Sequence, residues 1–115
     1  MTKIAAKSLL VLFLTLSCMT MTASSSEAAD GWIWNLTVHF VTVGADSYII
    51  DTDYHDSGCG SPGRFVIRKD APQAKEMYAM ALTALVSGKL VNVYAEPGQG
   101  CHLEGRVSTW VAIQK

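Results

Sequence analysis

Residues 70–95 are DAPQAKEMYAMALTALVSGKLVNVYA, and they predict one helix followed directly by a strand. Asp70 is placed to cap the helix N-terminus, and Pro72 falls in the first turn, where its missing N–H has no helical partner to lose. Gly88 is expected to end the helix as its C′ residue. The strand that follows covers residues 90–94. The helix carries an apolar stripe at helical spacing: Ala74, Met77, Tyr78, Ala81, Leu82 and Leu85.

Three strands are predicted before this helix. Residues 32–43 show the period-two alternation of a half-buried strand. The apolar positions change parity after Phe40, and a β-bulge near that residue would explain the change. Residues 47–51 and 64–68 form the next two strands, separated by a loop rich in Asp, Gly, Ser and Pro. One face of the first strand is expected to carry Trp32, Trp34, Leu36, Val38 and Phe40.

A last strand over residues 106–113 completes the element order β-β-β-α-β-β. Five short strands with one helix between the third and the fourth are typical of the OB fold, a small Greek-key barrel. A ferredoxin-like fold would need a second helix, which residues 29–115 do not indicate. The sequence therefore predicts an all-β class with one helix, in a five-stranded OB-fold-like barrel.

The N-terminal residues predict export. Lys3 and Lys7 precede an uncharged apolar run of signal-peptide length, and small residues follow it. Cleavage after Ala28 divides the chain into a signal peptide, residues 1–28, and a single OB-fold-like domain, residues 29–115. The mature protein is then secreted or periplasmic. An alternative is a lipoprotein signal ending at Cys18, which would anchor the protein through a lipid.

Two cysteines remain in the mature segment, Cys59 and Cys101. A domain of this size buries about 60–65% of its unfolded surface and is marginally stable on its core alone. Export permits a disulfide, and an even number of cysteines makes pairing the default. We therefore predict a Cys59–Cys101 disulfide.

The charge of the mature segment argues against a nucleic-acid partner. Residues 29–115 hold seven Lys and Arg against nine Asp and Glu, which gives a formal net charge of −2. Nucleic-acid-binding domains usually carry a clustered basic face, and no basic run occurs here.

Two clusters of side chains raise the question of a metal. Asp51, Asp53 and Asp56 lie close together, but without the spacing of an EF-hand, and a solvated loop is the preferred interpretation. A zinc site could use two histidines and two cysteines, although the predicted disulfide would remove both thiolates. The alternative zinc ligands are His55, Cys59, Cys101 and His102.

No catalytic residue, metal or cofactor is predicted. The sequence contains no Gly-x-Ser-x-Gly elbow and no evident Ser/His/Asp set, and so small a barrel offers little cleft for a carboxylate pair. The expectation is a protein that is not an enzyme.

Aromatic residues are numerous for this length, and some are candidates for ligand binding: Trp32, Trp34, Tyr48, Tyr54, Tyr94 and Trp110. Sugar rings present apolar C–H faces that stack on indole and phenol rings. Aromatic side chains in strands lie more often in a core or an interface. Trp34, Tyr48 and Tyr54 are the ligand-binding candidates that we select.

Residues 81–98, ALTALVSGKLVNVYAEPG, resemble the helix, glycine stop and strand of subtilase-cytotoxin B subunits. The resemblance extends less closely over residues 30–44. It implies an exported OB-fold subunit that forms a homo-oligomer, a pentamer in that family, binds cell-surface glycans and carries a separate toxin A chain. The family's sialic-acid-contacting serine aligns with Trp34, whose indole cannot bind a carboxylate in the same way. The family's fold therefore carries over better than its ligand.

Two other functions remain open. One is a stand-alone periplasmic OB-fold protein with a housekeeping or inhibitory role, and the other is a small metal-dependent enzyme. Apolar or small helix residues outside the main stripe, among them Met80 and Val86, favour self-association because a helix on one small barrel needs a single apolar face.

Overall fold

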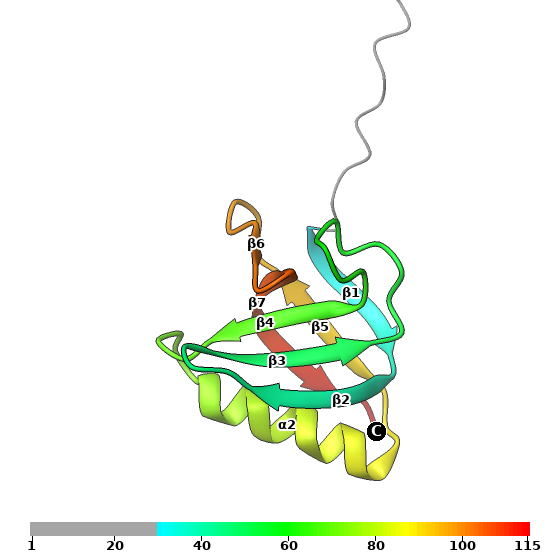
Figure 1. Cartoon of the computed structure of the whole chain (residues 1–115). Coiled ribbons are helices and arrows are strands. Elements are labelled where there is room, and N and C mark those ends of the chain that lie inside the picture. Colours follow the sequence, from blue (N-terminus) through cyan, green and yellow to red (C-terminus); the bar gives the residue numbers. More distant parts are fainter. Residues whose placement is uncertain (1–29) are drawn as a thin grey trace, which may run out of the picture.

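The computed structural model describes residues 30–115, which are mostly β with one helix (Figure 1). The predicted signal peptide and Cys18 lie outside these residues. The elements in chain order are β1 (Gly31–Leu36), β2 (Val38–Val43), β3 (Ser47–Thr52), β4 (Arg64–Arg68), α2 (Ala74–Ser87), β5 (Val91–Ala95), β6 (Cys101–His102) and β7 (Gly105–Ile113).

The seven strands form one mixed sheet in the order β1-β5-β7-β4-β3-β2, with β6 paired to β7. Every pair is antiparallel except β4 and β7, which are parallel. Within the described residues no ladder joins β1 to β2, so hydrogen bonds do not close the sheet into a barrel. The two edge strands are nevertheless consecutive in the chain, separated by Thr37 alone.

The expected count of five strands is wrong, for two local reasons. The first expected strand divides into β1 and β2 where Asn35 adopts a left-handed φ of 62° and the β1–β5 register shifts. Asparagine tolerates this conformation better than most side chains. The short strand β6 pairs with the start of β7 through a turn in which Leu103 and Glu104 both have positive φ. The bulge expected near Phe40 is confirmed, because the β2–β3 register shifts between Val38 and Phe40.

The expected face of the first strand is also wrong. Trp32 and Trp34 are exposed, whereas Ile33 between them is buried. Beyond Asn35 the parity has changed, and Leu36 is buried. The two tryptophans therefore lie on the opposite side of the sheet from the core.

The helix begins later than predicted. Its N-cap is Gln73, in the left-handed region and without a side-chain hydrogen bond, so the prediction of Asp70 as the cap is wrong. Its end is as predicted, since Gly88 has φ 73° and donates its N–H to the carbonyl of Ala84. The core of the apolar stripe is confirmed, because three of its positions, Ala74, Met77 and Ala81, are buried. Ala84, which was not assigned to the stripe, is buried as well.

The core lies between the concave side of the sheet and the helix. α2 contacts β2, β3, β4 and β7, and Figure 1 shows it lying across one end of the curved sheet. The most deeply buried large apolar side chains of this core come from β3, β4 and β5: Ile50, Phe65, Ile67, Val91 and Val93.

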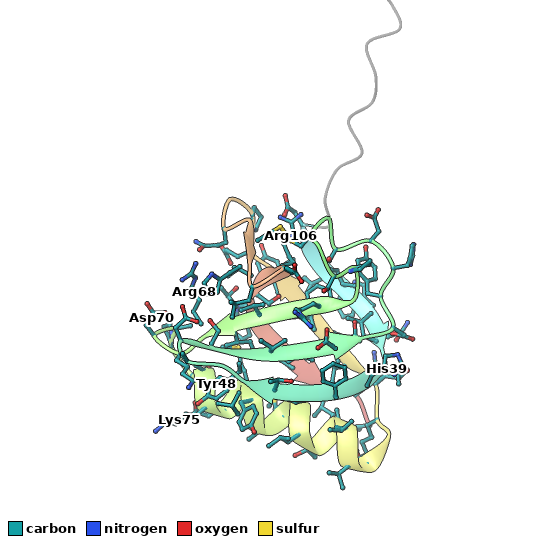
Figure 2. The ribbon with its side chains drawn as sticks, in the orientation of Figure 1. His39, Tyr48, Arg68, Asp70, Lys75 and Arg106 are labelled. Atoms are coloured by element: carbon teal, nitrogen blue, oxygen red, sulfur yellow. A yellow bond between two sulfur atoms is a disulfide. The ribbon has the colours of Figure 1, made fainter. Side chains whose placement is uncertain are left out.

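A disulfide and a buried arginine hold the other end of the sheet. Cys59, in the β3–β4 loop, is bonded to Cys101 of β6, with Cα atoms 5.7 Å apart and a sequence separation of 42 residues. Arg106 donates from Nε to the carbonyl of Ser57 at 3.0 Å. Figure 2 shows Arg106 at the end of the sheet away from the helix. The long β3–β4 loop is thus fastened to β6 and β7.

Candidate functional site: an aromatic face on the sheet

Three strands bring aromatic side chains into one row on the outer surface of the sheet. In β1, β5 and β7, Trp32 pairs with Tyr94, and Tyr94 pairs with Trp110. Successive side chains of a strand point to opposite faces, so the next positions along these strands form an inner row. That inner row is buried and consists of Ile33, Val93 and Val111.

Three rings of this surface, those of Trp32, Trp34 and Tyr94, contact one another. Trp34 stacks on Trp32 with ring centroids 5.4 Å apart, and Trp32 meets Tyr94 edge to face, also at 5.4 Å. The tryptophans are 41% (Trp32), 59% (Trp34) and 59% (Trp110) exposed. We call Trp32, Trp34, Tyr94 and Trp110 the aromatic face. It contains all three tryptophans of the chain, and so large a group of exposed rings usually marks a binding surface.

Three amide side chains, those of Asn35, Asn92 and Gln114, form a cluster beside Trp34 at one end of the aromatic face, and we call them the amide cluster. The Asn92 side-chain oxygen accepts the backbone N–H of Asn35 at 3.0 Å and the side-chain N–H of Gln114 at 2.7 Å. The Gln114 amide nitrogen also donates to the Asn35 side-chain oxygen at 2.7 Å. These bonds hold the left-handed Asn35 in place and orient the strand segment that carries Trp34.

An open pocket of about 270 Å³ lies at the other end, beside Trp110. The Glu96 carboxylate accepts a hydrogen bond from the Thr109 hydroxyl at 2.8 Å, which fixes one carboxylate oxygen. None of the lining residues is basic: Ala71, Pro72, Gln73, Glu96, Thr109 and Trp110.

Strained backbone positions flank the aromatic face on both sides. Non-glycine residues with positive φ are uncommon, and such strain often accompanies functional sites. The described residues contain four of them. Leu103 and Glu104 form the β6–β7 turn, whereas Asn35 belongs to the amide cluster and Gln73 lines the pocket.

The structure separates the three ligand-binding candidates selected from the sequence. Trp34 belongs to the aromatic face. Tyr48 is buried and stacks on Tyr78 of the helix, with ring centroids 4.4 Å apart (Figure 2). Tyr54 is half-buried against Phe65. Any role of these two tyrosines in ligand binding stays a prediction.

Sequence reasoning did not select Trp32, Tyr94 and Trp110, although it counted them among the aromatic residues. The shared parity of Trp32 and Trp34 was the one available signal. Tyr94 and Trp110 join them through strand pairing between distant segments.

Two residues of the acidic cluster and one of the two histidines make local polar contacts. Asp51 accepts from Arg64 Nε at 3.0 Å, and Asp53 accepts the backbone N–H of Thr37 at 2.9 Å. His102 Nε2 lies 3.0 Å from a carboxylate oxygen of Asp46, and this hydrogen bond lowers the pKa of the Asp46 carboxyl. Among residues 30–115, no three His, Cys, Asp or Glu side chains are grouped to hold a metal ion.

No protein-family model matches this chain, and a search of curated proteins finds no relative. The resemblance to subtilase-cytotoxin B subunits therefore stays a prediction. In the part of the chain that the structure describes, no helix is long and apolar enough to cross a membrane.

Proposed function

We propose that this protein is an exported, non-catalytic binding protein that holds an oligosaccharide on its aromatic face. The observation that carries the proposal is the in-register row Trp32–Tyr94–Trp110 with Trp34 stacked on Trp32. Neighbouring strands lie about 4.8 Å apart, so the row from Trp32 to Trp110 extends over about 10 Å. A surface of that length suits a few linked sugar rings.

The groups around the rings match the chemistry of a sugar. A pyranose ring offers an apolar C–H face for stacking and a rim of hydroxyls for hydrogen bonding. The aromatic face supplies the stacking surface, while the amide cluster and the Glu96 carboxylate supply polar partners at its two ends. Apolar lining with a few positioned polar groups is typical of small-molecule sites.

Single-stranded nucleic acid also stacks on aromatic side chains, but it requires a basic groove to follow its phosphates. No residue of the aromatic face, the amide cluster or the pocket is basic. The mature segment carries a formal net charge of −2. Electrostatics therefore favours a sugar over a polyanion.

The finer fold that we propose is the OB-like barrel. The edge strands β1 and β2 are consecutive segments of one bent strand. The strands β4 and β7 pair in parallel, and the helix α2 follows β4 in the chain. A barrel would follow if the bend at Asn35 carries this strand from one edge of the sheet to the other. A subunit resembling the toxin B chains, with a separate A chain as partner, is part of this proposal.

Export is the proposed localisation. The N-terminal pattern is that of a cleavable signal peptide. The Cys59–Cys101 disulfide supports an oxidising compartment, because such bonds form and persist mainly outside the cytosol.

A fluorescence titration tests the function directly. All three tryptophans of the chain lie on the aromatic face, so their emission reports on this surface alone. We expect emission from the exported protein to shift to shorter wavelength, in a saturable way, with at least one oligosaccharide of a mixed panel. A single-stranded oligonucleotide is expected to leave it unchanged. Saturable binding of the oligonucleotide, or no response to any sugar, would contradict the proposal.

We also propose that the exported domain forms homo-oligomers. Met80 and Val86 are 41% and 86% exposed on the helix, and β2 is an edge strand with Phe40 and Val43 exposed. Unpaired edges and exposed apolar groups favour contact with another copy. We expect light scattering at tens of micromolar to give more than the monomer mass, and Met80→Glu to reduce it. Gln99→Glu, in the exposed loop between β5 and β6 and away from the helix and β2, is a matched charge control. A monomeric wild-type protein would favour the stand-alone alternative.

A further inference from the structure

We propose that the pocket beside Trp110 selects sugars by charge: it accepts a neutral or amino sugar unit and rejects an acidic one. This inference rests on the proposed oligosaccharide function and specifies the ligand class of the same site. Its key group is the Glu96 carboxylate, which lies within the pocket lining.

The contacts of Glu96 leave it able to act on a ligand. One carboxylate oxygen accepts from the Thr109 hydroxyl at 2.8 Å, which holds the group in position. No ion pair of Glu96 with a lysine or arginine occurs among the described residues. The second oxygen is therefore free to accept a hydrogen bond from a sugar hydroxyl or ammonium group, and charge-assisted bonds of this kind are the stronger ones.

The size and walls of the pocket limit what enters it. Its volume of about 270 Å³ suits one sugar ring, and the ring of Trp110 forms one wall. A carboxylated sugar placed against Trp110 would bring its charge near Glu96, with no basic side chain in the lining to neutralise it. Repulsion between the two carboxylates and the loss of their hydration then oppose its binding. Unfavourable contacts with the wrong ligand are an established means of specificity.

The strained Gln73 supports the assignment. Its backbone occupies the left-handed region at φ 60° and ψ 25°, and it lacks a side-chain cap bond to the helix that it begins. Gln73 lines the same pocket as Glu96, although 23 residues separate the two in the sequence. Its amide adds both a donor and an acceptor for sugar hydroxyls.

Three monosaccharides with the same ring test the pocket without knowledge of the whole ligand: glucosamine, glucose and glucuronate. Amide NMR shifts of Thr109 and the indole N–H of Trp110 in the exported protein are the measurement. We expect glucosamine and glucose to bind more tightly than glucuronate by about three- to tenfold, as for a partly exposed charge. Glu96→Gln should remove most of that difference, because glutamine keeps the acceptor for Thr109 without the charge.

Asp56→Asn is the matched control, since it removes one exposed carboxylate from the β3–β4 loop, outside the pocket lining. It should leave the order of the three sugars unchanged. Equal affinity for glucuronate, or the same selectivity after Glu96→Gln, would overturn the charge selection. Shifts at Trp32 and Trp34 with an oligosaccharide would still support the proposed function in that case. Absence of shifts at Trp110 with all three sugars would overturn the pocket assignment.

Discussion

Replacing Trp32 by alanine is expected to weaken oligosaccharide binding about 10- to 100-fold, which corresponds to about 1.4–2.8 kcal/mol. Trp32 is central to the aromatic face, because it stacks on Trp34 and meets the edge of Tyr94. Its removal takes away one stacking ring and the support of two others. The side chain is 41% exposed on the side of the sheet away from the core, so the folded state should survive.

Isothermal titration calorimetry is the suitable measurement, since the variant also loses one fluorescent reporter. Leu103→Ala provides a control, because Leu103 is an exposed apolar side chain in the β6–β7 turn, outside both the aromatic face and the proposed contact between copies. It should bind the oligosaccharide like the wild type. An unchanged affinity of Trp32→Ala, with a native circular dichroism spectrum, would show that the ligand binds elsewhere.

Removing the disulfide is expected to have the largest effect on stability. The double variant Cys59→Ser/Cys101→Ser should lower the free energy of unfolding by about 2–5 kcal/mol. The bond closes a sequence separation of 42 residues, for which the chain-entropy model gives about 4 kcal/mol. A small domain is stable by only about 5–15 kcal/mol in total, so this loss is a large fraction.

Urea denaturation of the purified protein measures this loss. The wild type with a thiol reductant should unfold at the same lower midpoint as the double variant, which separates the effect of the bond from that of the serines. The aromatic face lies on strands β1, β5 and β7, and neither cysteine belongs to it. Oligosaccharide affinity of the folded variant should therefore stay near that of the wild type. A loss below about 1 kcal/mol would contradict this account of the bond.

Several elements of the fold follow from local sequence. The helix stop at Gly88 was predictable because glycine adopts the left-handed conformation of a C′ residue without steric cost. The strands near residues 47–51 and 64–68 were predictable because β-branched and aromatic residues are concentrated between turn-forming segments. The pairing of Cys59 with Cys101 followed from their even count in a segment that the sequence predicts to be exported.

Other features depended on residues whose conformation local sequence does not reveal. The alternation of residues 32–40 was visible, but the left-handed Asn35 reverses which side of the sheet each parity faces. The helix start was misplaced for a similar reason. Gln73 holds a left-handed cap that its own side chain does not favour, so packing of Ala74 and Met77 against the sheet decides the start.

The candidate site also has features that local sequence predicts and features that depend on the tertiary structure. The sequence by itself determined that the chain is rich in aromatic residues, carries no basic cluster and builds its strands from period-two patterns. Only the tertiary structure decided that Trp32, Tyr94 and Trp110 form one row, because their alignment depends on the β1–β5 and β5–β7 registers. The period-two pattern shows only that successive side chains point to opposite faces of the sheet. The burial of Ile33, Val93 and Val111 against the core determines which of the two faces is outside.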